Sequence, residues 1–128
     1  MASITVFGRE YPMAYTVEAQ AEIAKRFGGI EKIELAFNTE DVASMMVNMA
    51  FCAAVMCKAY EDRERVRCKF MGEEYTPKEV VSEAELICAI EPKEVPEISS
   101  AIMEAMKEGN KTTVEVEPAK GKNADATP

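Results

Sequence analysis

The chain has 128 residues, of which 48% are hydrophobic and 30% charged, and its formal net charge at pH 7 is −8. This length suits one domain, and the negative charge disfavours nucleic acid and anionic membrane surfaces as ligands. Histidine is absent. Because histidine is the commonest general base and metal ligand, we expect neither an enzyme nor a cofactor or metal site.

The four cysteines have none of the close spacings that bind zinc or form redox motifs. They are Cys52, Cys57, Cys68 and Cys88. We interpret them as free thiols that pack as small hydrophobic side chains. The first ten residues lack the apolar stretch of a signal peptide. Together these features predict a protein of a reducing cytoplasm.

The first predicted element is a β-hairpin over residues 3–14. Hydrophobic and polar residues alternate on both sides of Gly8-Arg9, which we expect to form a two-residue turn. Pro12 places the second strand at a sheet edge, because proline has no N–H to donate. A lone hairpin is marginally stable, so it must pack on helices.

Two helices are predicted next. Thr16 is the expected N-cap of a helix of about eleven residues that ends at Gly28-Gly29. A second, shorter helix is predicted in residues 30–37. The alternation of Ile33, Leu35 and Phe37 would also fit a strand there.

A long central helix is expected to begin at Asn38 or Thr39. One stripe of this helix is expected to face the core, and it comprises Val42, Met45, Met46, Met49, Ala53, Met56 and Tyr60. The mainly apolar residues between Asp41 and Lys58 number sixteen. This is fewer than the ~20 needed to span a bilayer, so the pattern predicts a buried helix of a globular domain.

The next segment mixes two signals. Alternation in residues 65–75 is compatible with a strand, whereas "TPKE" at residues 76–79 has the pattern of a capping box with proline in the first helical turn. This box predicts a helix that turns Val80, Ala84 and Ile87 towards the core.

The last predicted helix has Pro96 in its first turn and ends at Gly109. Its hydrophobic stripe is Ile98, Ala101, Ile102, Ala105 and Met106. Residues 110–128 have too few large apolar side chains to form a core, so they predict a flexible polar tail. The expected fold is α+β and mainly α-helical. An N-terminal hairpin packs on about four to five helices in one domain, residues 1–109.

Hydrophobic residues on the rear of the central helix indicate a binding surface. A helix in a domain of this size buries both faces only if a second layer covers the rear. Methionine side chains, which are flexible, suit binding of varied apolar helices. The candidate partner-binding residues are Val47, Phe51, Val55, Met103 and Met106.

The order of these elements resembles a known family. "ITVFGREYPMAYTVEAQAEIAKRFGGIEKIELAF", an apolar helix, "EEYTPKEVV" and "AIMEAMKEG" are similar to tail assembly chaperones of long-tailed (siphovirus-like) phages and prophages of Gram-positive bacteria. The resemblance covers about residues 3–109. It implies a protein of the host cytoplasm, absent from the mature virion, that self-associates, binds the tape measure protein and shields its apolar helices.

The resemblance also implies a longer product, made by a −1 ribosomal frameshift, that recruits tail tube subunits. Gly121-Lys122-Asn123 can be encoded by GGA AAA AAC, which contains the slippery heptamer A AAA AAC. Residues 110–128 would then link a second domain. Two alternatives stay open: a structural phage protein, such as a head–tail connector or minor tail component, and a small acidic helical protein-binding module.

Overall fold

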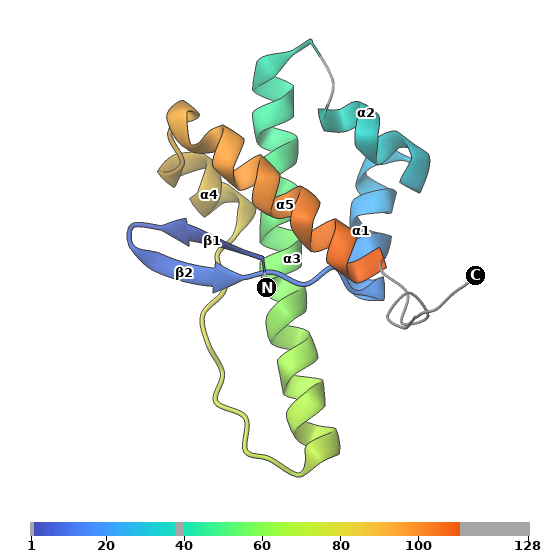
Figure 1. The fold of residues 1–128 in the computed structure, drawn as a ribbon, viewed down its shortest axis with the longest axis vertical. Helices are drawn as coiled ribbons and strands as arrows, with labels where there is room; N and C mark the ends of the chain where they lie inside the picture. Colours follow the sequence, from blue (N-terminus) through green and yellow to red (C-terminus); the bar gives the residue numbers. More distant parts are fainter. Residues whose placement is uncertain (1, 38–39, 111–128) are drawn as a thin grey trace, which may run out of the picture.

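The computed structural model describes residues 2–37 and 40–110. In this part of the chain an antiparallel hairpin, β1 (Ser3–Val6) and β2 (Arg9–Pro12), precedes the helices (Figure 1). The helices are α1 (Val17–Phe27), α2 (Ile33–Phe37), α3 (Val42–Met71), α4 (Glu83–Ala89) and α5 (Val95–Asn110), with short 3₁₀ turns η1 (Ile30–Lys32) and η2 (Pro92–Glu94). The predicted α+β, mainly helical fold with an N-terminal hairpin is confirmed. The predicted tail, from residue 111 onward, lies outside the described residues.

Helix α3 is the axis of the fold. It runs along the longest dimension, α5 crosses it obliquely, and α1 and α2 lie on the opposite side from α4 and the hairpin (Figure 1). The chain after β2 is tied to the helix, because the backbone N–H of Ala14 donates to the carbonyl of Met56 at 3.1 Å. The other helices and the hairpin lie around the N-terminal part of α3, and its C-terminal end extends beyond them (Figure 1).

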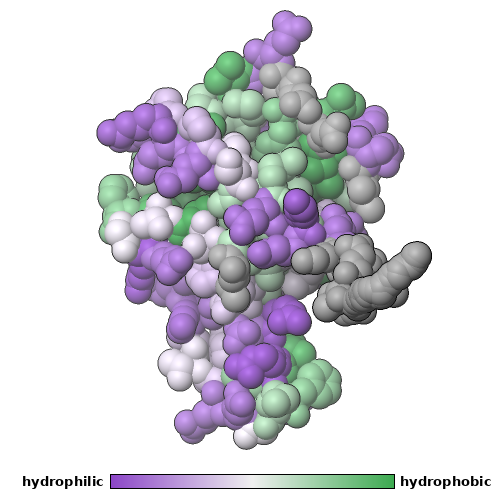
Figure 2. Space-filling model, in the orientation of Figure 1, coloured by the Kyte–Doolittle hydropathy of each residue, from purple (hydrophilic) through white to green (hydrophobic). Residues whose placement is uncertain are grey.

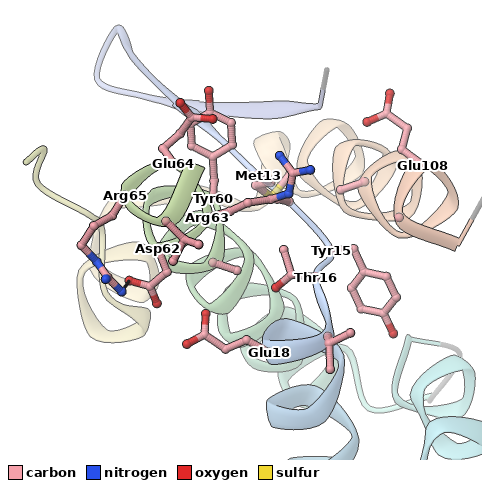
Figure 3. Close-up of a pocket in the computed structure, with 16 residues that line it drawn as sticks. Met13, Tyr15, Thr16, Glu18, Tyr60, Asp62, Arg63, Glu64, Arg65 and Glu108 are labelled. Carbon is pink, nitrogen blue, oxygen red and sulfur yellow. Dashed lines mark ion pairs between the residues drawn. The ribbon is translucent and has the colours of Figure 1, made fainter. Parts of the chain in front are cut away.

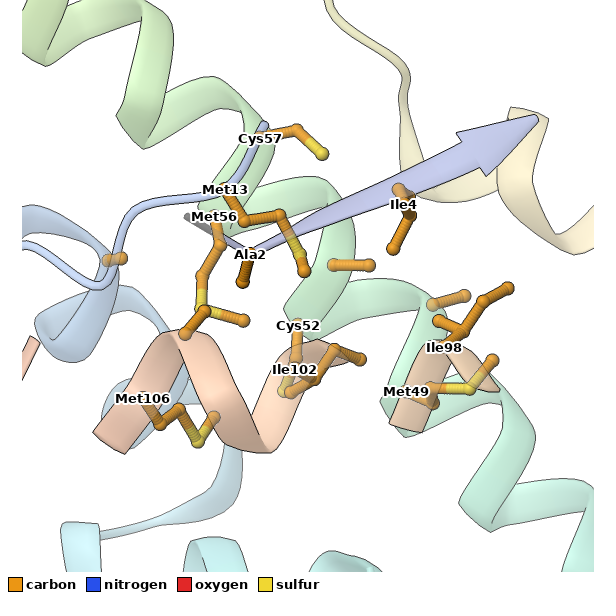
Figure 4. Close-up of a cluster of buried hydrophobic side chains, with 14 of the residues drawn as sticks. Ala2, Ile4, Met13, Met49, Cys52, Met56, Cys57, Ile98, Ile102 and Met106 are labelled. Atoms are coloured by element: carbon orange, nitrogen blue, oxygen red, sulfur yellow. The ribbon is translucent and has the colours of Figure 1, made fainter. Parts of the chain in front are cut away.

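The core forms where α3, α5 and the hairpin meet (Figure 4). Its buried side chains include Ala2, Ile4, Met13, Met49, Cys52, Met56, Cys57, Ile98, Ile102 and Met106. The predicted core stripe of α3 is right at Met49, Ala53 and Met56, which are all at most 1% exposed. It is wrong at Val42, which is 57% exposed because it lies in the first turn, beyond the covering helices.

The hairpin has the predicted strands, but its turn lies one residue earlier. Val6 pairs with Arg9, so the turn residues are Phe7 and Gly8, with φ angles of 50° and 80°. Positive φ at both positions is what a type I′ turn requires, and this turn matches the twist of the strands. The register that results lets Ile4 reach the core at 3% exposure.

Helix α3 is longer than the hydrophobic pattern indicates. The side chain of Asp41, rather than Asn38 or Thr39, caps its first turn by accepting from the Ser44 N–H at 3.3 Å. The helix continues to Met71, where Gly72 in the left-handed conformation ends it. The strand-like alternation of residues 65–71 is therefore helical. Charged pairs three residues apart favour this outcome, as between Arg67 and Glu64 at 3.1 Å.

Helix α4 begins later than "TPKE" predicts. Its N-cap is Ser82, which forms a capping box with Glu85, and residues 73–81 have no regular structure. As a result Leu86 is fully buried, whereas Val80, Ala84 and Ile87, predicted to face inward, are exposed.

Distance explains why the first capping box is not used. The start of α4 lies close to Phe51 of α3, because Arg26 contacts both. Its guanidinium pairs with Glu83 at 3.2 Å and lies 4.2 Å from the Phe51 ring centroid. From Met71 back to Phe51 the helix axis measures about 30 Å. Residues 72–82 must cover this distance before α4 begins. As an extended segment they reach ~36 Å, whereas as a helix they would reach only ~16 Å.

Helix α5 carries the predicted stripe, with Ile98, Ile102, Ala105 and Met106 buried. It does not end at Gly109, as the sequence predicts, but continues to Asn110. A Cβ at position 109 would overlap the carbonyl oxygen and Cβ of Tyr15. Glycine is therefore needed here for close approach to the chain entering α1, and it does not cap the helix.

Candidate protein-binding site

The thiols of the described residues are poor candidates for chemistry. Cys52, Cys57 and Cys68 are buried and only Cys88 is exposed. Burial raises the pKa of the Cys52 and Cys57 thiols to about 12, which keeps them protonated at neutral pH. Among these residues no group of three or more His, Cys, Asp or Glu side chains is placed to hold a metal ion.

An open cleft of about 910 Å³ lies between the start of α1, the middle of α3 and the end of α5 (Figure 3). Its charged lining residues are Glu18, Asp62, Arg63, Glu64, Arg65 and Glu108. Several of these charges are balanced within the chain. Lys58 Nζ lies 2.8 Å from Asp62 and 3.8 Å from Glu18, and Arg65 lies 3.8 Å from Asp62.

The pKa values of two neighbouring carboxyl groups in this cleft, those of Asp62 and Glu18, are shifted in opposite directions. The hydrogen bond from Lys58 lowers the pKa of Asp62. Burial, followed by the hydrogen bond with Asp62, raises the pKa of Glu18. Lys58 and Arg65 of α3 thus pair with Asp62, and Lys58 also pairs with Glu18 of α1, so these charges form a structural network that joins α1 to α3.

A second concavity lies between the N-terminal half of α3 and α4, and its character is different. It is a groove of about 270 Å³, and the ten described residues that line it are all apolar. They are Ala43, Met46, Val47, Met49, Ala50, Leu86, Ile87, Ile90, Pro92 and Val95. Such a surface offers shape and dispersion contacts rather than hydrogen bonds.

The groove has a buried floor and an accessible rim. Met49, Ala50, Leu86 and Val95 form the floor, each at most 8% exposed, and Met46 and Ile90 are half-buried. On the rim, Ile87 is 48% and Val47 is 37% exposed. The floor belongs to the packed core, so the groove is already formed in the free protein.

Contacts behind the groove fix the position of α4. The capping box of Ser82 and Glu85 starts this short helix, and Arg26 of α1 holds its first residue, Glu83, through two hydrogen bonds of 3.2 and 3.4 Å. The same guanidinium lies over the Phe51 ring of α3 at 4.2 Å. One arginine of α1 therefore contacts both of the helices that form the groove.

The structure separates the five predicted partner-binding residues. Val47 lines the groove. Phe51 and Val55 are half-buried against the core, and the Phe51 ring meets Phe27 edge-on with centroids 6.1 Å apart. Met106 is 9% exposed and belongs to the core, whereas Met103 is 50% exposed on α5, outside the groove lining.

Sequence reasoning missed most of the groove. Met46 was assigned to the core stripe, and Ile87 was expected to point inward, but both line the groove. A signal was available in "SEAE" at residues 82–85, which fits a capping box as well as "TPKE" does. Starting the helix there turns Leu86 inward and leaves Ile87 on the rim.

Helix α3 also has the length and composition of a membrane-crossing helix. It has 30 residues, more than the sixteen mainly apolar residues on which the sequence prediction was based. In the fold, 39% of its most apolar 18-residue window is buried. A single helix that meets these criteria of length and composition is weak evidence for a membrane span, because core helices of soluble proteins also meet them.

Comparison with known proteins adds no relative. No protein-family model matches the chain, and no curated protein or solved structure matches it. The features that bear on function are therefore the apolar groove and the resemblance of the sequence to tail assembly chaperones.

Proposed function

We propose that this protein is a phage tail assembly chaperone, and that the α3–α4 groove binds apolar helical segments of the tape measure protein. The observation that carries the proposal is the groove itself, which is open to solvent and lined entirely by apolar side chains among the described residues. The family resemblance supplies the identity of the client.

The groove has the properties that binding of an apolar helix requires. Amphipathic helices dock in hydrophobic grooves through residues spaced three and four apart. The half-buried Met46 lines the groove on α3, and methionine adapts to side chains of different shape. A lining without hydrogen-bonding side chains selects for apolarity more than for sequence, as a chaperone for many tape measure segments needs.

The wider role follows from the resemblance. The chaperone acts in the host cytoplasm, covers the tape measure protein before the tail tube surrounds it, and leaves before the virion is complete. A longer, frameshifted product brings the tail tube subunits. No catalytic step, cofactor, metal, nucleic acid or membrane takes part in this role.

Peptide binding tests the groove directly. We expect fluorescently labelled amphipathic helices from the cognate tape measure protein to bind the wild-type chain, and Ile87→Glu to weaken binding at least about tenfold, because it places a charge in an apolar contact. Val17→Glu is the matched control, since Val17 is 84% exposed and lies outside the groove. Equal binding by both variants would exclude the groove.

Two further measurements separate the chaperone from its alternatives. The coding DNA from Lys120 onward should contain a slippery heptamer followed by an open −1 frame. Mass spectrometry of purified virions should find no copies of the chain, whereas a head–tail connector or minor tail component would be present. Without the −1 frame, a general acidic protein-binding module is the better description.

A further inference from the structure

The charged residues beside the α3–α4 groove are almost all negative. Within two positions of a lining residue, the sequence has five acids and one base, Lys93. The acids, which we call the groove acids, are Asp41, Glu85, Glu91, Glu94 and Glu97. Consecutive Cα atoms are about 3.8 Å apart, so the Cα of each groove acid lies within ~7.6 Å of the Cα of a lining residue. In Figure 2 the surface over the turn from α4 into α5, at the upper left, is largely hydrophilic.

The fold neutralises little of this negative charge. Lys93 Nζ lies 3.6 Å from the Glu91 carboxylate and balances one of the five acids. Glu85 and Glu94 accept hydrogen bonds from the backbone N–H groups of Ser82 at 2.9 Å and Glu91 at 2.8 Å. A backbone N–H has no net charge, so both carboxylates remain negative. Five acids and one base leave an excess of four negative charges beside the groove.

Acids of the larger cleft between α1, α3 and α5 are arranged differently. There Lys58 pairs with both Glu18 and Asp62, and Glu64 pairs with Arg67 at 3.1 Å. Those carboxylates are balanced by bases of the same chain and hold its helices in place. The negative field beside the groove is instead available to a bound molecule, whose positive charges it would attract.

We propose that the α3–α4 groove selects cationic amphipathic helices, in which lysine or arginine residues flank the apolar residues that enter the groove. The proposal rests on the proposed function, because it takes the groove as the client site, and it adds which client segments bind there. Apolar contacts supply binding to any helix of suitable shape, and the groove acids favour a helix with basic flanks over one with neutral or acidic flanks.

The rim of the groove suits the side chains of lysine and arginine. Ile87 is 48% exposed and Val47 is 37% exposed, so apolar surface continues from the groove onto the rim. Lysine and arginine lay their aliphatic stems along apolar surface and keep the charged end in water. A flanking base of the client would therefore cover the rim with its stem and place its charge near the groove acids.

The size of the effect follows from the exposure of these charges. An exposed ion pair changes affinity by up to about fivefold, so two or three such pairs predict a preference of roughly tenfold. Salt screens exposed charges, because the Debye length falls from about 30 Å at 0.01 M to about 3 Å at 1 M ionic strength. The preference should therefore be large at low salt and disappear at high salt.

Two labelled model peptides test the proposal on the full-length chain. Both are amphipathic helices with the same apolar residues, and their flanking positions are either lysine or glutamine, which have similar helix propensities. In fluorescence anisotropy we expect the lysine peptide to bind about tenfold more tightly at roughly 0.01 M salt, and within about twofold of the glutamine peptide at about 1 M.

A pair of double variants assigns the preference to the groove acids. Glu91→Gln with Glu97→Gln should reduce the preference to about threefold or less, because two of the five charges are lost. Glu22→Gln with Glu104→Gln is the matched control, since it changes the net charge equally at exposed positions away from the groove lining. Circular dichroism checks that both variants are folded. Equal effects of the two would overturn the proposal, because the preference would then reflect net charge alone.

The remaining outcomes separate this proposal from the proposed function. Equal binding of both peptides, weakened by Ile87→Glu, would overturn the charge selection and leave the groove as the client site. A lysine preference that Ile87→Glu does not weaken would overturn the charge selection as well, because the peptide would then bind outside the groove. Groove binding of the lysine peptide without binding of tape measure peptides would overturn only the proposed client. Failure of all peptides to bind would overturn both.

Discussion

Gly109 lies inside α5 where the helix touches the chain that leads into α1. Alanine is normally better than glycine inside a helix by about 0.5–1 kcal/mol. At this position, however, a Cβ would overlap backbone and side-chain atoms of Tyr15. We expect Gly109→Ala to lower the free energy of unfolding by roughly 1–3 kcal/mol, as overpacking does. Urea denaturation measures the change, with Ser100→Ala on the exposed side of α5 as a near-neutral control. A stabilised Gly109→Ala would show that Tyr15 moves away at no cost.

Phe51 illustrates what single residues reveal and conceal in the sequence. Its position among polar residues on the rear of α3 made it a candidate for partner binding. In the fold, residues of α1 in the same chain contact its ring. The Phe27 ring centroid lies 6.1 Å from the Phe51 centroid, and the Arg26 guanidinium lies 4.2 Å from it. The residues that cover it are 24 and 25 positions away in the chain. No local pattern indicates such a contact, so exposure on a rear face cannot be judged from periodicity alone.

At the scale of elements, the chain contains two possible capping boxes for α4, and the helix starts at the second, Ser82 to Glu85. Ser82 accepts from the Glu85 N–H at 3.1 Å, and the Glu85 carboxylate accepts from the Ser82 N–H at 2.9 Å. We expect Ser82→Ala to destabilise the protein by ~1 kcal/mol, the usual cost of losing an N-cap. Thr76→Ala should have little effect, because Thr76 lies in the irregular segment. Thermal unfolding of the two variants decides between the boxes, and the reverse order would place the helix start at Thr76.

Elements whose ends are set by local chemistry were predictable from the sequence. Thr16 caps α1 and Gly28 ends it as expected, and the stripe of α5 is buried as expected. The C-terminal end of α3 and the start of α4 were not predictable. They depend on the distance that the chain covers between Met71 and the position of α4 beside the first half of α3. The groove depends on the same distance, since α4 forms one of its walls. The sequence therefore predicted an apolar binding surface on the central helix but could not locate the groove, of whose lining it named only Val47 as a candidate.

At the scale of the whole molecule, α3 joins two regions of unequal protection. This helix contacts α1, α2, α4, α5 and β2 of the hairpin, and its buried residues concentrate between Met49 and Ala59. Its C-terminal end projects, and the segment of residues 72–82 runs beside it (Figure 1). Opening of the projecting end breaks few contacts, whereas opening of the first half requires the core to come apart. The three buried cysteines of α3 are distributed between these regions, so their reactivity reports each region separately.

Pulse alkylation with iodoacetamide, read out by peptide mass spectrometry, should resolve an order of reaction. Cys88 is exposed and should react first, followed by Cys68 in the projecting end. Cys52 and Cys57 should react slower than Cys88 by roughly a hundredfold or more, because their reaction requires global unfolding. Equal rates for Cys52 and Cys68 would mean that α3 opens as one unit and that the projecting end is no less protected than the core.

The two buried thiols also predict a pH dependence of stability. The native pKa of Cys52 and Cys57, about 12, exceeds the ~8.5 of an unfolded thiol, so above pH 8.5 the unfolded state binds fewer protons. The free energy of unfolding should accordingly fall as the pH rises from about 8.5 towards 12, and Cys52→Ala should reduce that slope.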